Sequence, residues 1–274
     1  MMVTIVFYIF LFLYGIIIGS FLNVCILRVP LKETIVLKRS HCMKCGHQLA
    51  WYDLFPLFSY IFLSGKCRYC KAKISKQYPI IELINGVFAV LCFLIEGFLV
   101  NDIDKSMDNI MIVYWFFTML LSAILCSVLL VISVIDWRTF EIPLGANIII
   151  LILGILHLIA NIVVYGSDGN WADLVAGFFI VSIPFTAIYY FSKGKAIGGG
   201  DVKLMAAAGL FLGWKLCLVA FFTGCLYGSI IHIARMKISG EGKQLAMGPY
   251  LAAGIITSLW FGRHIVEWYA GFFS

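Results

Sequence analysis

Charged residues are scarce in this chain of 274 residues, where they make up 12% of the composition against 62% for hydrophobic residues. The mean hydropathy is correspondingly high, at +1.01. Soluble globular domains carry about 25% charged residues, so this composition excludes that class. The sequence instead predicts a polytopic membrane protein.

The start of the chain lacks the features of a cleaved signal peptide. No basic segment precedes its apolar run, and no small-residue cleavage site comes before Arg28. We therefore expect the first run to be retained as a membrane helix.

Long apolar runs predict an all-α architecture, because about 20 apolar residues in a helix cross the hydrocarbon core of a bilayer. The run at 202–212 is shorter than this, yet the charge of the loops around it requires it to cross. We therefore expect about eight transmembrane helices. The seven longer candidates are 3–24, 79–100, 110–134, 143–165, 172–191, 216–235 and 249–270.

Lys and Arg gather between the first two predicted helices and set the orientation. Ten of them stand at 28–76, against only Glu33 and Asp53. Such an excess marks the cytoplasmic side, so we expect the N-terminus outside. The outside then also holds the segment with Asp102, Asp104 and Asp108 and the segment 166–170. The cytoplasmic side holds 136–141, 193–203 and the loop with Arg235, Lys237 and Lys243.

The sequence divides into four parts on this basis. The parts are the first transmembrane helix at 1–27, a cytoplasmic insert at 28–78, the second transmembrane helix with an outer loop at 79–109, and a membrane domain at 110–274. All other loops are short, so the insert is the one segment that can form a small domain outside the bilayer.

Four cysteines of the insert stand in two C-x-x-C pairs, Cys42 with Cys45 and Cys67 with Cys70, with 21 residues between the pairs. Cytoplasmic thiols stay reduced, so this spacing favours a tetrahedral structural zinc site over disulfides. Four thiolates close the zinc shell and leave no position for a catalytic water. The alternatives to a zinc site are a redox pair or unrelated buried cysteines. Within a zinc site, His41 and His47 are possible substitutes for cysteine ligands.

Gly46 and Lys71 directly follow the two pairs, as residues of tight knuckle turns do. An insert of about 50 residues buries too little apolar surface to fold on burial alone. We therefore expect metal binding to supply much of its stability.

Two aspartates at the ends of predicted spans are the candidate catalytic residues, because ionisable groups in a membrane are usually functional. Asp136 ends the third span and Asp201 begins the short run at 202–212, so both are expected at the cytoplasmic face and within reach of each other. Two adjacent carboxyls share one proton, so that one acts as base and the other as acid. Such a pair activates water and protonates a leaving amine, which predicts peptide hydrolysis.

Two other interpretations of these aspartates stay open. Taken singly, each suits a helix cap or flank, a role that Asp fills well. Taken together, they suit an ion relay in a proton-coupled transporter. Transporters usually place such groups near the midplane and contain inverted repeats, and no repeat is visible in this sequence.

Gly198, Gly199 and Gly200 directly precede Asp201. Backbone without side chains can approach a substrate strand closely or adopt conformations closed to other residues. We expect this glycine run to serve one of these two purposes.

Seven segments between about residue 15 and residue 262 resemble, in order, those of the bacterial type IV prepilin peptidase family. The segments are GSFLNVCILRVP, CMKC, WYDLFPLFSYIFLSGKCRYC, YPIIELINGVF, DWRTFEIP, GGGDVKLMAAAGLFLGW and GPYLAAG. Members of this family are GxGD-type membrane aspartic proteases that also act as N-methyltransferases. The chain departs from the family pattern at Leu144, where Asp is common, and at Leu54, where Asn is frequent. These departures bear on substrate positioning rather than on the catalytic pair.

The resemblance implies a two-step activity in the bacterial plasma membrane. The leader of type 4 prepilins and pseudopilins is cleaved after a glycine at the cytoplasmic face, and the new N-terminus is methylated with S-adenosylmethionine. The family's catalytic pair falls on Asp136 and Asp201, which makes 110–274 the aspartic peptidase domain. Its zinc segment, associated with methyl transfer, falls on Cys42, Cys45, Cys67 and Cys70.

The resemblance also implies a biological setting in pilus assembly, type II secretion or competence. The expected partners are the prepilin and pseudopilin substrates and membrane lipid, and we expect no nucleic acid.

The site of the methyl donor is less defined. The sequence has no G-x-G-x-x-G after a strand, so a site for S-adenosylmethionine has to be built from the cysteine loop and helix ends. Glu82 and Asn85, near the cytoplasmic start of the second helix, are our candidates for it. Equally, this polar pair suits packing against other helices.

Overall fold

The structure is a computed structural model that describes residues 2–35, 39–101, 109–239 and 245–272. Some residues used for the predicted orientation lie outside these ranges. They are Lys38, Asp102, Asp104, Asp108 and Lys243.

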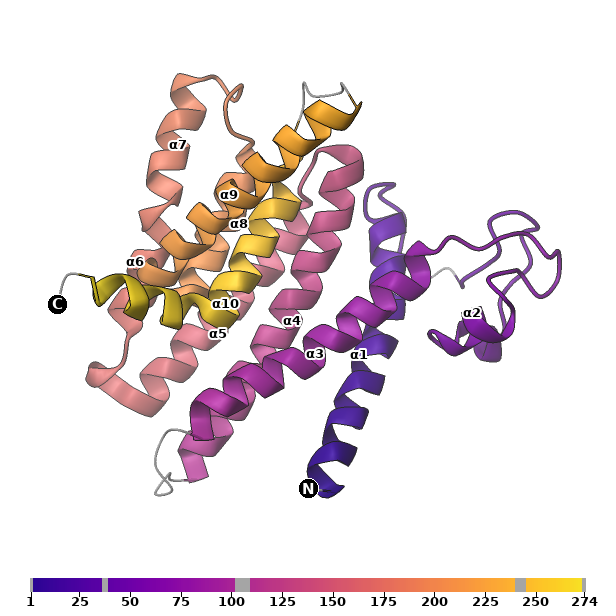
Figure 1. Ribbon diagram of the computed structural model, residues 1–274, viewed down its shortest axis with the longest axis horizontal. Helices are drawn as coiled ribbons and strands as arrows, with labels where there is room; N and C mark the ends of the chain where they lie inside the picture. The colour runs from indigo at the N-terminus through magenta and orange to yellow at the C-terminus, as the bar shows by residue number, and fades with distance from the viewer. Residues whose placement is uncertain (1, 36–38, 102–108, 240–244, 273–274) are drawn as a thin grey trace. The chain divides into compact units, whose positions relative to one another are not determined.

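The chain divides into two compact units, Met1–Leu94 and Ile95–Ser274. Figure 1 shows that both are built from helices, and the described residues contain no strand, only two isolated bridges in the insert. The helices that begin in the first unit are α1 (Met2–Arg28), η1 (Trp51–Leu54), α2 (Phe58–Phe62) and α3 (Gln77–Asn101). The later helices are α4 (Asn109–Thr139), α5 (Leu144–Tyr165), η2 (Gly166–Asp168), α6 (Trp171–Ile180), α7 (Ser182–Phe191), α8 (Gly199–Leu212), α9 (Trp214–Ser239) and α10 (Gly248–Ala270).

The predicted all-α membrane class is confirmed. Six segments are helical, long and apolar enough to cross a membrane. They are Thr4–Arg28, Gln77–Glu96, Asn109–Thr139, Leu144–Asp168, Trp171–Phe191 and Trp214–Lys237. The two other predicted spans are the helices α8, with 14 residues, and α10, with 23, and neither is among the six. A count of eight therefore stays a prediction.

The predicted helix at 172–191 is interrupted at Val181, between α6 and α7. Pro184 has no N–H to donate to the carbonyl of Ile180, and its ring crowds that carbonyl. The break in the helix follows from this single residue.

Helix α1 presents two different faces. Large apolar side chains at helical spacing are exposed on one face, namely Phe10, Tyr14, Ile17 and Phe21. On another face Gly15 lies so near α3 that an added Cβ would come within 2.8 Å of the Cα of Gly86. Small residues allow close packing of helices in lipid, and the large ones are suited to contact with acyl chains.

Helix α8 forms the centre of the second unit, since every residue from Leu204 to Leu212 is buried. It contacts α5, α6 and α9. A Cβ added at Gly177 of α6 would overlap the carbonyl oxygen of Gly209 in α8, and a Cβ at Gly209 would overlap the carbonyl of Gly177. The two backbones therefore touch directly, and this contact fixes the position of α8.

Candidate functional site

Asp136 lies in the last turn of α4, and the residue is 5% exposed. Its Oδ2 accepts a hydrogen bond of 2.9 Å from the backbone N–H of Gly248, the first residue of α10. The first amides of a helix have no partner within the helix and attract negative charge. Asp136 thus receives a donor from a helix that begins 112 residues later.

Gly248 has no room for a side chain beside Asp136. An added Cβ would lie 2.8 Å from Oδ2 and 3.0 Å from both Cβ and Cγ of the aspartate. Only a hydrogen atom at this position lets the start of α10 approach the carboxylate.

We expect Gly248→Ala to lower the stability of the protein by about 1–3 kcal/mol, because overpacking forces α10 or Asp136 to move. The measurement is the thermal unfolding midpoint in detergent. Gly145→Ala is the matched control, since a Cβ there meets nothing within 4 Å and alanine favours the helix. Equal midpoints for the two variants would contradict the close approach.

Asp201 lies in the first turn of α8, behind the N-cap residue Gly198. A Cβ on Gly198 would come within 2.9 Å of Oδ2 of Asp201, and a Cβ on Gly200 within 3.0 Å of Cβ of Ile142. Gly198 has a φ of −72°, and Gly199 and Gly200 are helical. The glycine run therefore provides space and does not adopt conformations closed to other residues.

Asp136 and Asp201 lie near each other in the second unit, and their role as a catalytic pair stays a prediction. The negative charge of Asp136 acts on Asp201, and the turn between α4 and α5 links their surroundings through Ile142, which packs against Gly200. Buried Asn147 of α5 donates from Nδ2 to the carbonyl of Gly200 at 3.4 Å. This contact connects α5 to the backbone that precedes Asp201.

The capping interpretation fits Asp201 in part and does not fit Asp136 on its own helix. Asp201 is the third residue of α8 rather than its N-cap, and its carboxyl accepts from the backbone N–H of the N-cap residue Gly198. Asp136 stands at a C-terminal end, where a helix disfavours negative charge, and accepts its hydrogen bond from α10 instead. Two neighbouring carboxyls of this kind can share a proton and work as acid and base.

Two residues of this site were missed from the sequence, Gly248 and Asn147. Gly248 stands in the GPYLAAG segment, which drew attention only through the family resemblance. Asn147 gives no sequence signal, because a single Asn at the start of an apolar helix is common in helix packing.

The four cysteines of the insert form one cluster, as their spacing predicts. Their Sγ atoms all lie within 4.8 Å of one another, and those of Cys42 and Cys70 are 3.8 Å apart. Four sulfurs at about 2.3 Å from a tetrahedral zinc stand roughly 3.8 Å from each other. The cluster therefore fits zinc, and it can hold this ion without His41 or His47.

The two cysteine pairs have the same local geometry. Gly46 and Lys71 both have positive φ, at +69° and +59°, and donate to the carbonyls of Cys42 and Cys67 at 2.9 and 3.0 Å. Each turn is closed by an isolated bridge, His41 with Gln48 and Lys66 with Lys73. The predicted knuckle turns are thus present in both halves.

Backbone amides prepare Cys42 for metal binding. The N–H groups of Cys45 and Lys44 point to its sulfur and lower the pKa of this thiol from its ordinary value to about 6. Zinc binds the thiolate form, so these two amides favour the ligand state of Cys42.

Glu82 and Asn85, the candidates for the methyl donor, both bond to backbone. Oε2 of Glu82 accepts from the N–H of Leu57 in the insert at 2.8 Å, and Nδ2 of Asn85 donates to the carbonyl of Gly15 in α1 at 2.8 Å. The contact of Asn85 is one of helix packing. Glu82 instead ties α3 to the segment that precedes α2.

Comparison with known proteins finds two families along the chain. The Bacterial Peptidase A24 N-terminal domain matches residues 13–95, a range that holds the four cysteines. The Type IV leader peptidase family matches residues 123–233, a range that holds Asp136 and Asp201. No solved structure matches the chain.

Curated relatives share the name prepilin leader peptidase/N-methyltransferase. A relative from Pectobacterium carotovorum is 32% identical, with 88% of each chain covered. One from Bacillus subtilis is 30% identical over 94% of this chain and 96% of the relative. One from Myxococcus xanthus is 32% identical over 86% of this chain, which spans 65% of that relative's length.

Proposed function

The chain belongs to the bacterial type IV leader peptidase family, and from this premise we propose that it removes the leader of type 4 prepilins and pseudopilins and methylates the new N-terminus. Cleavage follows a glycine of the substrate, at the cytoplasmic face of the plasma membrane. The observation that carries the proposal is the meeting of Asp136 and Asp201 in one unit, with Gly248 donating to the first of them.

In the proposed hydrolysis the two carboxyls hold one proton between them. The ionised carboxyl takes a proton from a water molecule, whose oxygen forms a bond to the scissile carbonyl carbon. The protonated carboxyl gives its proton to the leaving nitrogen as the C–N bond breaks. The pair ends with one proton again and is ready for the next cycle.

The chemistry of the substrate suits a site at a membrane surface. A prepilin has a cationic leader that prefers the cytoplasm and an apolar helix that prefers the bilayer, so its scissile bond is held at the interface. An acid pair at the cytoplasmic ends of α4 and α8 is at the depth of that bond.

We assign the cysteine cluster a structural zinc ion that folds the insert for the methyl transfer step. Four thiolates fill a tetrahedral shell, so the ion does not take part in hydrolysis. In the transfer, the new amine loses a proton to water and its lone pair forms a bond to the methyl carbon. The bond from that carbon to the sulfonium sulfur breaks, and its electrons stay on sulfur.

The test is incubation of the detergent-solubilised protein with a synthetic peptide of pilin leader and helix, with and without S-adenosylmethionine. Mass spectrometry is expected to find cleavage after glycine in both reactions and one added methyl group only with the donor. A control peptide with a bulky residue in place of that glycine should stay intact. If the peptide is not cut after the glycine, the proposed peptidase activity is wrong. If it is cut but not methylated in the presence of S-adenosylmethionine, the proposed methyltransferase activity is wrong.

A further inference from the structure

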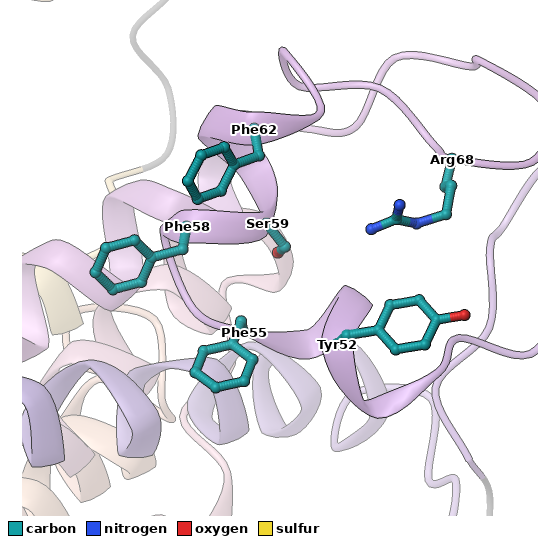
Figure 2. A pocket seen from close by; sticks show the side chains of 6 residues that line it. All are labelled: Tyr52, Phe55, Phe58, Ser59, Phe62 and Arg68. Carbon is teal, nitrogen blue, oxygen red and sulfur yellow. The ribbon is translucent and has the colours of Figure 1, made fainter.

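The insert contains an aromatic pocket that no sequence pattern indicated (Figure 2). Its volume is about 480 Å³, within the usual range of roughly 300–1,000 Å³ for small-molecule sites. Figure 2 shows the rings of Phe55, Phe58 and Phe62 on one side and Tyr52 and Arg68 on the other, and the lining residues are Tyr52, Phe55, Phe58, Ser59, Phe62 and Arg68. We call it the aromatic pocket.

Arg68 is held in place at one end of the aromatic pocket. Its Nε donates to Oδ1 of Asp53 at 2.7 Å, and its guanidinium lies over the ring of Tyr52 at 5.1 Å. Burial by itself would raise the pKa of Asp53, but hydrogen bonds from Arg68, the amide of Ala50 and Tyr69 outweigh it and hold that pKa below its ordinary value. Asp53 therefore stays ionised and orients the guanidinium, whose two terminal nitrogens suit a carboxylate.

Glu82 fixes the helix that supplies three of the lining residues. Leu57 directly precedes α2 and has a φ of 59°, a conformation that a branched side chain rarely adopts. Its N–H donates to Oε2 of Glu82 at 2.8 Å. This buried carboxylate on α3 thus holds the strained start of α2, and with it Phe58, Ser59 and Phe62.

We infer that the aromatic pocket binds S-adenosylmethionine, with Glu82 as a positioning residue that does not line it. The inference rests on the proposed function and gives its methyl transfer step a location. Aromatic faces stack on an adenine ring and attract an onium group such as a sulfonium. The guanidinium of Arg68 matches the carboxylate at the other end of this ligand.

A lipid surface is the main competing occupant, since the rings of Phe55, Phe58 and Phe62 are exposed. Two features favour the small molecule. The lining includes a guanidinium already paired with a carboxylate, an arrangement that acyl chains do not need. The lining also combines polar and apolar side chains around an open hollow, whereas insertion into a bilayer requires only a protruding apolar face.

The experiment is equilibrium dialysis of radiolabelled S-adenosylmethionine with the full zinc-loaded chain in lipid nanodiscs. We expect Phe58→Ala and Tyr52→Ala to weaken binding about tenfold through loss of ring contact. Ile61→Ala is the matched control, because this residue also lies in α2, is 68% exposed and does not line the pocket. It should change affinity by less than about twofold.

A second ligand separates the two ends of the pocket. 5′-Methylthioadenosine has the adenine ring but no carboxylate. Arg68→Ala should therefore weaken S-adenosylmethionine about tenfold and leave this analogue unchanged, whereas Phe58→Ala should weaken both. Glu82→Ala should weaken both ligands, and Glu82→Gln, which keeps an oxygen acceptor for Leu57, should restore them.

The experiment distinguishes failure of the aromatic pocket from failure of the proposed methyltransferase activity. Wild-type binding that no lining variant alters overturns the pocket and leaves the transferase standing. A wild type that cleaves but neither binds nor transfers overturns both. Leader cleavage and zinc content show whether each variant is folded. If Phe58→Ala is not folded, Phe62→Ala replaces it as the test of ring contact, because Phe62 is 82% exposed and its loss should not disturb folding.

Discussion

Replacement of Asp201 by Asn is expected to lower kcat/KM for leader cleavage by about 10³-fold or more, since positioned acid–base groups contribute about 10²–10⁴-fold. An amide neither takes the proton of water nor returns one to the leaving nitrogen. Asp136→Asn should have the same effect, although its amide oxygen can still accept from Gly248. Cleavage of a pilin peptide, followed by mass spectrometry, gives the rates.

The double variant tests whether the two carboxyls act as a unit. Its rate should equal that of either single variant, because groups that share one step have non-additive effects. Asp168→Asn is the control, an equal change of charge at an exposed residue in η2, beyond the far end of α5. More than about a tenth of wild-type activity in either single variant would contradict an acid pair.

Removal of zinc should unfold the insert while the second unit stays folded. Structural zinc contributes an apparent free energy of about 10–16 kcal/mol in zinc-finger peptides, far more than so small an insert gains from burial. We expect Cys67→Ser, or a strong chelator, to speed tryptic cleavage between Lys44 and Lys73 by about 100-fold. Methyl transfer should be lost, whereas leader cleavage should remain, because both aspartates lie in the other unit.

Cys225→Ser provides the matched control for this experiment, since this thiol lies in α9 and not in the cluster. It should keep one zinc per chain by elemental analysis, and Cys67→Ser should not. A zinc-free insert that resists trypsin as well as the wild type does would show that burial suffices for its folding.

Local patterns predicted most of what the fold and the cysteine cluster display. Apolar runs located the long helices, and the C-x-x-C spacing located four sulfurs and both knuckle turns, because each depends on residues close in sequence. The break between α6 and α7 was not predicted, although Pro184 is the local signal that could have indicated it. The number of spans was less accessible, since α8 is buried by neighbouring helices and does not need the length of a lipid-facing span.

The parts of the site that escaped prediction depend on how helices pack. The amide of Gly248 reaches Asp136 across 112 residues, and Nδ2 of Asn147 reaches the backbone of Gly200 across 53. The aromatic pocket escaped for a related reason, because Tyr52, Phe58 and Arg68 gather around a space only once the zinc turns and Leu57 have set the path of the chain. The sequence indicated a role for the glycines before Asp201 but left two explanations open. Only the structure shows that they leave room for neighbouring side chains and that their backbone dihedral angles are ordinary.

The backbone contact between Gly177 and Gly209 makes the position of Asp201 sensitive to residues remote from it. Asp201 precedes Gly209 by eight positions, roughly 12 Å along a helix. A methyl group at either glycine would force α8 away from α6, and a rigid helix transmits such a displacement along its whole length. Loss of activity can therefore arise at an apolar crossing with no ionisable group, and a search for functional positions confined to polar residues would overlook it.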